Sequence, residues 1–289
     1  MEVHGPHLPV GADLYEADGL LLRAAEKVAE RHPDLTFLHL PGVFAAADVL
    51  PHKGSLRFRP GTVVRVLEDL GASLAAQGIH DIWVSNFHGG PRHFVAIEAA
   101  CARVQKRHGA RMVPLFSLLI GRLTGGTSDV SGLMAEALGV PAADLQGDVH
   151  GGALETSILL HLVGALIDPM YRDLPPRTLN RELREAGRRP VHKGERPTLL
   201  ELLRSFPLSY RYFERTTYAG APARATPEGG RRALETFTDH AATALDEVLD
   251  GSLPPARWHS PLWPLRSLLL NETFGALVDR VLATRPPGV

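Results

Sequence analysis

Cysteine, long apolar runs and an excess of either charge are scarce in this sequence, and each scarcity excludes a class of protein. Cys101 is the only cysteine, so neither an intrachain disulfide nor a cysteine-based zinc site can form. Its helical, apolar surroundings predict a small buried hydrophobe rather than a nucleophile. The 31 basic and 32 acidic residues give a net charge of −1, which provides no general attraction to nucleic acid or anionic membranes.

No apolar run reaches the ~20 residues that a membrane span needs, and the start lacks the pattern of a signal peptide. We therefore expect a cytoplasmic protein with no membrane partner. Hydrophobic residues make up 44% of the 289, enough for a substantial core. Histidine is plentiful at 14, and many histidines stand beside glycine, proline or carboxylates, which is a first indication of metal chemistry.

Strand-like and helix-like patterns alternate through the first half of the chain. Helical periodicity is present in residues 13–32 (with Asp13 as N-cap), 62–78, 94–109 and 128–139, and from about Ala153 onward. Strand-like runs occupy residues 36–44, 79–86 and 110–120. This alternation predicts an α/β fold with a mainly parallel sheet flanked by helices.

The character of the chain changes after about residue 175. Residues 175–200 are rich in arginine and proline and predict a long loop or arm, followed by a short helix over 198–206 and an amphipathic helix that ends near residue 250. We expect one domain over residues 1–250 and a helical tail over 251–289.

Three clusters carry residues suited to chemistry. The first is Glu2, His4 and Asp13, in which Glu2 and His4 point the same way if the segment is extended. The second is His88, directly after an expected buried strand, where open α/β sheets place their ligands. The third is His150 with Glu155, at the change from loop to helix. A set of histidines and carboxylates without sulfur suits Zn²⁺, Mn²⁺ or Fe²⁺.

The same segments resemble the creatininase (creatinine amidohydrolase) family. "EVHGPHLPVGAD" is similar to the family pattern E-x-H-G-x-H-L-P-x-G-x-D, "SNFHGG" to its N-G-H-G-G-N loop, and "HGGALETS" to H-A-G-x-x-E-T-S. "YAGAPARATPEGGRRALE" resembles the segment before the family's late helix. The resemblance implies a layered α/β sandwich, a site for two divalent metal ions, frequent homohexamers, and cleavage of C–N bonds in small cyclic or formylated amides.

Carried over by position, the resemblance assigns Glu2 and His88 to one metal, His4 and Glu155 to the other, and Asp13 as the bridge between them. It makes His150 a proton shuttle or substrate-binding group, and it implies catalysis by His150 and Glu155 on a small-molecule amide. We therefore expect an amidohydrolase. The alternatives are a peptidase or deformylase with the same site, and a non-catalytic homologue with a binding or scaffold role.

The sequence departs from the family pattern at two places near this site. Creatininase itself has a glutamate two residues after the loop histidine, where this chain has Gly90, and the difference argues against creatinine as substrate. Family members have a strand before the glutamate, whereas only Met1 precedes Glu2 here, so either the start of the sequence is misassigned or this branch lacks its first strand. We expect its absence to open a sheet edge and to leave the Glu2 backbone poorly anchored.

Other conspicuous residues have plainer interpretations. We expect His7 to orient a metal ligand and His93 to lie on the surface. Trp83, Trp258 and Trp263 are expected to contribute packing rather than chemistry.

Overall fold

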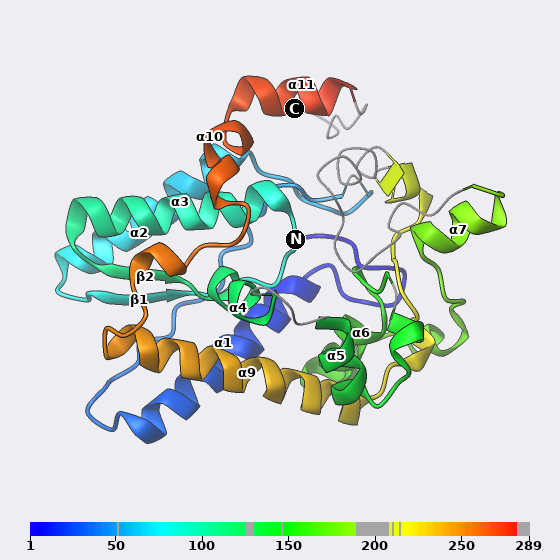
Figure 1. Cartoon of the computed structure of the whole chain (residues 1–289), viewed down its shortest axis with the longest axis horizontal. Helices are drawn as coiled ribbons and strands as arrows, with labels where there is room; N and C mark the ends of the chain where they lie inside the picture. Colours follow the sequence, from blue (N-terminus) through cyan, green and yellow to red (C-terminus); the bar gives the residue numbers. More distant parts are fainter. Residues whose placement is uncertain are drawn as a thin grey trace.

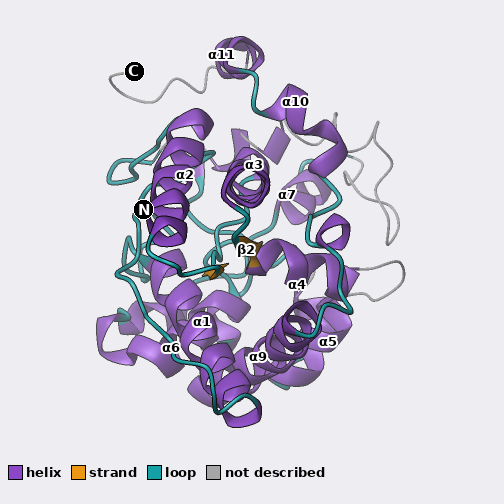
Figure 2. Cartoon of the chain, turned by 90° about the vertical axis from the view of Figure 1, so that its left-hand side faces the viewer, coloured by secondary structure: helices purple, strands orange, loops and turns teal. Residues whose placement is uncertain are grey.

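A small parallel sheet lies between two layers of helices (Figures 1 and 2). The computed structural model describes residues 1–50, 52–124, 130–145, 147–188, 208–209, 211–213 and 215–281. The strands are β1 (Asp81–Val84) and β2 (Arg111–Pro114), paired in parallel with Ile82 opposite Met112. The α-helices are α1 (Ala12–Arg31), α2 (Pro60–Ala76), α3 (Pro91–His108), α4 (Leu115–Thr124), α5 (Val130–Leu138), α6 (Ala153–Val163), α7 (Leu179–Glu185), α9 (Pro227–Leu249), α10 (Arg266–Leu269) and α11 (Glu272–Val281).

The two helical layers bury different cores. One core lies among α2, α3 and the strands, and Val63, Val104 and Met112 belong to it. The other lies among α1, α4, α6 and α9, the long helix that packs on α1 and α6. Helix α1 contributes the stripe Ala12, Glu16, Leu20, Ala24 and Val28, spaced four residues apart. A fully buried leucine on such a stripe contributes about 1.5–3 kcal/mol, so packing rather than propensity holds these helices in place.

Several predicted boundaries are confirmed by glycine and helix-start geometry. Gly109 caps α3 in the left-handed conformation at φ 70°, and Gly78, just past α2, has φ 84°. Helix α6 begins at Ala153, as the change of pattern predicts. Thr226 accepts a hydrogen bond from the N–H of Gly229 at the start of α9. The α/β class is therefore confirmed, in a helix-rich form.

The sheet is smaller than predicted. The strand expected over residues 36–44 has no strand conformation, and the strand expected over 110–120 stops at Pro114, where α4 begins. Phe37, Leu38 and Phe44 remain at least 39% exposed. The difference lies in pairing: residues 36–44 make no backbone hydrogen bonds to β1, whose only paired strand within the described residues is β2.

The segment after residue 175 is not all loop. Helix α7 lies within it, capped by Thr178, whose side chain accepts from the N–H of Arg181. Residues 189–207, including the helix expected over 198–206, lie outside the described residues, as do the expected caps Ser128 and Asp129.

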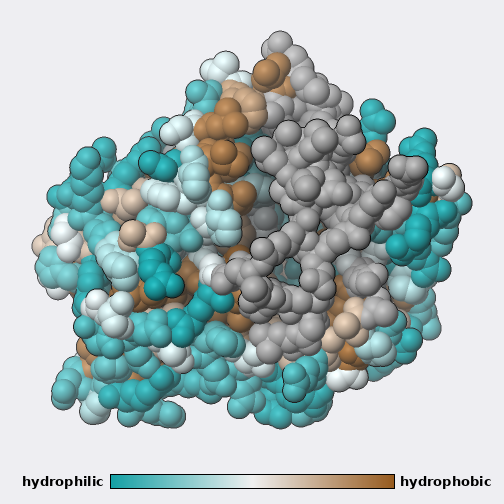
Figure 3. Space-filling model, viewed as in Figure 1, coloured by the Kyte–Doolittle hydropathy of each residue, from teal (hydrophilic) through white to brown (hydrophobic). Residues whose placement is uncertain are grey.

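Between residues 251 and 281 the chain contains the helices α10 and α11, in keeping with the expected helical extension, and α10 packs on α3. Trp258 is buried and donates its indole N–H to the carbonyl of Leu253, a packing role. Apolar side chains gather over α10 on the face in Figure 3, where Leu265 and Leu268 are each 46% exposed. Among the described helices, none combines the length and apolar character required to cross a bilayer.

Candidate metal centre

The first eleven residues form a closed turn that buries Glu2 and His4. The N–H of Glu2 donates to the carbonyl of Val10 at 3.1 Å, so the two ends of the segment meet. Gly5 has φ 76°, and a Cβ there would lie 2.7 Å from the ring of His7. A carboxylate oxygen of Glu2 also accepts from the N–H of Leu50. The expectation that the Glu2 backbone is poorly anchored is therefore wrong, because its N–H is bonded to Val10 and its side chain to Leu50.

Asp13 lies in the first turn of α1 and faces the histidines on both sides of it. The helix begins at Ala12 with Gly11 as N-cap, so the prediction that Asp13 is the cap is wrong. Its carboxylate is thereby free of a capping role. One oxygen lies 3.2 Å from Nε2 of His4 and the other 3.6 Å from Nδ1 of His88.

His88 is fixed by the loop that leaves β1. The side chain of Asn86 accepts from the N–H of His88 at 3.1 Å and donates to its carbonyl at 2.9 Å, which closes a tight loop. The ring donates from Nε2 to the carbonyl of Ala47 at 2.8 Å. Its Nδ1 then lies 2.9 Å from Oε2 of Glu2.

His150 and Glu155 reach the centre from the start of α6. Asp148 accepts hydrogen bonds from the N–H groups of Ala153 and Leu154, which fixes the first turn of that helix. Glu155 accepts from the N–H of Gly151 at 2.6 Å, and its Oε2 lies 3.7 Å from Nε2 of His4. The rings of His4 and His150 are in contact, with centroids 4.0 Å apart and planes tilted by 31°.

All three histidines of the centre direct one ring N–H to a backbone carbonyl. His4 donates from Nδ1 to the carbonyl of Glu2 at 3.1 Å, and His150 from Nε2 to that of Val3 at 2.9 Å. His88 donates to Ala47 as described above. A carbonyl only accepts, so each of these nitrogens carries the proton and the other nitrogen is left for a ligand. Metal-binding histidines are commonly oriented in this way.

The electrostatics show a centre that holds positive charge. Burial opposes ionisation of Glu2, but the charge and hydrogen bond of His88 outweigh it and lower the pKa of Glu2 to about 2. For Asp13 the opposing effect of burial is likewise outweighed, by His4 and His88, and its pKa is lowered. Burial would lower the pKa of His88, yet Glu2 and Asp13 raise it to about 9. In this state a proton on His88 compensates two buried carboxylates, a role that a divalent cation can take.

The neighbouring groups differ in their protonation. Burial and the charge of His4 lower the pKa of His150 to about 4, so its ring is neutral at pH 7. Burial raises the pKa of Glu155 to about 7, against the attraction of His4. Two buried groups with opposite shifts are typical of a functional site.

Two overlapping triplets of side chains could each hold an ion. In the described chain, Glu2, Asp13 and His88 bring one ligand atom apiece within 4.8 Å of one another, and so do Glu2, His4 and His150. Glu155 faces His4 but belongs to neither triplet. The donors are nitrogen and carboxylate oxygen without sulfur, which suits Zn²⁺, Mn²⁺ or Fe²⁺. The residues present therefore fit a site for divalent metal ions.

His93, expected on the surface, is buried beside the centre. Its Nδ1 accepts from the N–H of Ala47 at 3.3 Å, and its Nε2 donates to Oδ1 of Asn86 at 3.0 Å. Burial lowers its pKa to about 3, so the ring stays neutral. The expectation fails because α3 begins at Pro91, earlier than residue 94, and its first turn faces the loop of His88.

Sequence reasoning missed two further features. Residues 46–50 wrap around His88 and Glu2, but their composition carries no motif. Glu16 lies one turn after Asp13, fully buried, with no hydrogen bond to either carboxylate oxygen within the described structure. The only available signal for Glu16 was a charge on the apolar stripe of α1. His7 is buried and its Nε2 lies 2.9 Å from Oγ1 of Thr156, next to Glu155 along the chain.

Comparisons with known proteins identify the family from the sequence and a shared fold from solved structures. The family profile described as "Creatininase: Creatinine amidohydrolase" matches residues 1–245. A solved structure of a putative creatinine amidohydrolase from Bacteroides fragilis is similar at 18% identity, with a TM-score of 0.55 over 85% of each chain. A creatininase mutant with tryptophan replaced by phenylalanine is similar at 18% identity and a TM-score of 0.51, over 86% of this chain and 87% of that one. No curated protein is matched with significance.

At these identities the solved structures show the fold, and the profile match supplies the family. The layered α/β arrangement, the buried N-terminal turn and the loop after β1 lie within the matched residues. The chain therefore belongs to the creatininase (creatinine amidohydrolase) family.

Proposed function

We propose that this chain is a divalent-metal-dependent amidohydrolase that cleaves a C–N bond of a small cyclic or formylated amide. The observation that carries the proposal is the position of Asp13, whose two carboxylate oxygens face two different histidines, His4 and His88. A carboxylate between two ligand sets is the arrangement that a pair of metal ions needs.

In this proposal Glu2 and His88 would hold one ion, His4 and Glu155 would hold the other, and Asp13 would contribute to both. Zn²⁺, Mn²⁺ and Fe²⁺ all suit these donors. When bound, such a pair acidifies a water molecule and polarises an amide carbonyl. His150 is close enough to Glu2 and His4 to be a candidate ligand as well as a candidate proton carrier.

The residues of the chain supply binding and proton transfer. In this proposal Glu155 accepts the proton that the attacking water loses as its oxygen bonds to the carbonyl carbon. That proton passes to the unprotonated Nδ1 of His150, and His150 delivers it to the leaving nitrogen as the C–N bond breaks. Its ring is held by the bond from Nε2 to Val3, which leaves Nδ1 for this transfer. The products are an acid and an amine, and no further reactant is needed.

Gly90 bears on which substrate the centre accepts. A Cβ at this position would lie 2.6 Å from Nε2 of His88 and 3.0 Å from the carbonyl of Ala47. The space that a glutamate would use is therefore occupied by residues 47–48, which favours an amide other than creatinine. Assembly as a homohexamer and a cytoplasmic location remain predictions from the family resemblance and the composition.

The test combines metal analysis with a panel of amides. Purified protein should hold two divalent ions per chain and hydrolyse at least one cyclic or formyl amide, and chelation should abolish that activity. His150→Gln should retain the metal and lose about 10²–10⁴-fold in kcat. A loaded site that hydrolyses no amide would favour a non-catalytic binding role, and cleavage confined to peptides would favour a peptidase. Failure of the wild type to bind metal would refute the site itself.

A further inference from the structure

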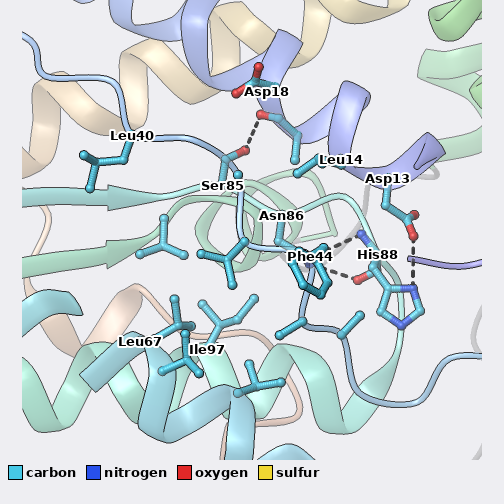
Figure 4. A pocket seen from close by; sticks show the side chains of 18 of the residues that line it. Asp13, Leu14, Asp18, Leu40, Phe44, Leu67, Ser85, Asn86, His88 and Ile97 are labelled. Atoms are coloured by element: carbon cyan, nitrogen blue, oxygen red, sulfur yellow. Dashed lines mark hydrogen bonds and ion pairs between the residues drawn. The ribbon is translucent and has the colours of Figure 1, made fainter. Parts of the chain in front are cut away.

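A largely apolar cavity of about 210 Å³ opens from the metal centre into the space between α1, α2 and β1 (Figure 4). Its walls also include residues 40–46, which run across the exposed side. The close-up shows Asp13 and His88 at one end and Leu14, Leu67 and Ile97 farther along. The cavity is therefore continuous with the candidate centre.

The chemistry of the lining changes along the cavity. The hydrogen-bonding side chains next to the centre are those of Asp13, Asn86 and His88, together with His93. Ser85 and Asp18 also line the cavity, but Ser85 donates to the carbonyl of Ala17 and Asp18 pairs with His39. Beyond them, α2 contributes Val63, Val66, Leu67, Leu70 and Leu74, and α1 contributes Leu14, Ala17 and Leu21. A group that binds in this outer part meets few hydrogen-bond partners, so it must itself be apolar.

The size of the cavity limits what it can hold. An apolar protein cavity of about 150 Å³ stays dry and binds benzene. At about 210 Å³ this cavity has room for a phenyl ring or a short alkyl chain. The cavity is too small for a nucleotide, which needs a larger and more polar site.

We propose that this cavity binds an apolar substituent, a phenyl or short alkyl group, of the amide that is cleaved at the metal centre. The inference rests on the proposed function and adds the substrate class. The amide lies between the metal ligands and His150, and its substituent points past Asp13 toward Leu67. Burial of the substituent contributes about 0.8 kcal/mol per methylene, so such amides bind more tightly than unsubstituted ones.

Residues 40–46 form the outer wall and are suited to admit the group. Leu40, Val43 and Phe44 are 43%, 44% and 55% exposed, although each lines the cavity. Gly42 lies so close to Leu14 that a Cβ would meet its side chain at 2.3 Å. The wall is thus a single layer of apolar side chains in contact with solvent.

The first arm of the test needs no catalysis. Toluene should bind to the metal-loaded protein in calorimetry. Ala17→Phe, which fills the cavity, should weaken the binding of toluene by about tenfold or more. Ala72→Phe, also half-buried but on the side of α2 away from the cavity, is the matched control and should bind as the wild type does. Circular dichroism should confirm that both variants are folded.

The second arm measures KM for formamide and for formanilide. In the wild type and in Ala72→Phe, formanilide should have a KM lower by about tenfold or more, and in Ala17→Phe this difference should shrink.

Equal KM values in the presence of turnover would overturn the inference and leave the proposed function standing. If no amide is cleaved, the proposed function fails and the inference fails with it. A third result is that toluene does not bind and that Ala17→Phe changes the sedimentation coefficient of the protein. A segment of polypeptide would then occupy the cavity beside β1, and the inference would be overturned.

Discussion

Oε2 of Glu2 lies 2.9 Å from Nδ1 of His88, and this contact joins the first turn of the chain to the end of β1. Both side chains are buried, at 2% and 6% exposure. Each is also fixed through residues 46–50, Glu2 by the N–H of Leu50 and His88 by the carbonyl of Ala47. Two candidate ligands that lie far apart in the sequence are thus both fixed by residues 46–50.

Asp13→Asn should impair both metal positions together. The amide keeps the size of the side chain but removes the charge and one acceptor oxygen. Changes one layer outside a metal site already cost about 10–100-fold in affinity, so a shared ligand should cost at least about 100-fold. Elemental analysis and a metal titration measure the effect. Asp18→Asn on the same helix, whose partner is the exposed His39, is the control and should bind metal normally.

His93→Ala should weaken metal binding although His93 is not itself a proposed ligand; its ring meets that of His88 edge-on, with centroids 5.2 Å apart. The substitution removes the acceptor for Ala47 and the donor for Asn86, which together position His88. We expect a loss of about 10–100-fold in metal affinity and about 1–3 kcal/mol in the free energy of unfolding. Metal titration and urea unfolding test the two parts. His108→Ala, at the exposed end of α3, should change neither, and an unaltered metal affinity in His93→Ala would contradict the positioning role.

Gly90→Ala and Gly89→Ala should differ sharply in stability. A Cβ at Gly90 would lie 2.6 Å from Nε2 of His88 and 2.8 Å from Cβ of Asp48, whereas a Cβ at Gly89 meets no described atom within 4 Å. Overpacking of this kind costs about 1–3 kcal/mol, so only Gly90→Ala should lower the melting temperature clearly. Equal melting temperatures would mean that residues 47–48 do not lie against the loop as described.

Glu98 should make folding stability depend on pH. Burial raises its pKa in the folded protein, although the N–H of Ser260 donates to its Oε1 at 2.6 Å. Between the unfolded pKa of about 4.3 and the raised folded value, the folded state binds more protons than the unfolded state. The contribution of Glu98 to stability is therefore complete below the unfolded pKa, and it is lost as the pH rises through the folded pKa.

Glu98→Gln should remove that dependence. As the pH rises from about 5, just above the unfolded pKa, to about 8, the melting temperature of the wild type should fall more than that of the variant. Glu185→Gln, on the exposed surface of α7, should follow the wild type. Parallel curves for the wild type and Glu98→Gln would show that Glu98 ionises without cost in the folded protein.

Local patterns in the sequence predicted much of the helical framework. Helices α1, α2 and α3 are present because their apolar residues repeat with a helical period. Gly78 and Gly109 follow two of them in the left-handed conformation, which glycine adopts without strain. The candidate ligands were also predicted, since glutamate, histidine and aspartate next to glycine and proline are unusual at a chain start. These signals depend on neighbours along the chain.

What failed depended on neighbours in space. Residues 36–44 have the composition of a strand, but a strand needs a hydrogen-bonded partner, and β1 is paired only with β2 in the part of the chain that is described. His93 appeared to be a surface residue until the early start of α3 placed it under Asn86. Composition cannot report either fact, because pairing and burial are properties of the packed chain.

The sequence by itself determined the family, the α/β class and the identities of the candidate ligands, because residue type, order and period are local properties of the chain. The tertiary structure alone decided that Glu2 is anchored, that Asp13 faces two histidines, and that an apolar cavity runs from the centre along α2. Distances of this kind arise only when segments remote in sequence bury their surfaces together, since packing and not chain order sets which atoms meet.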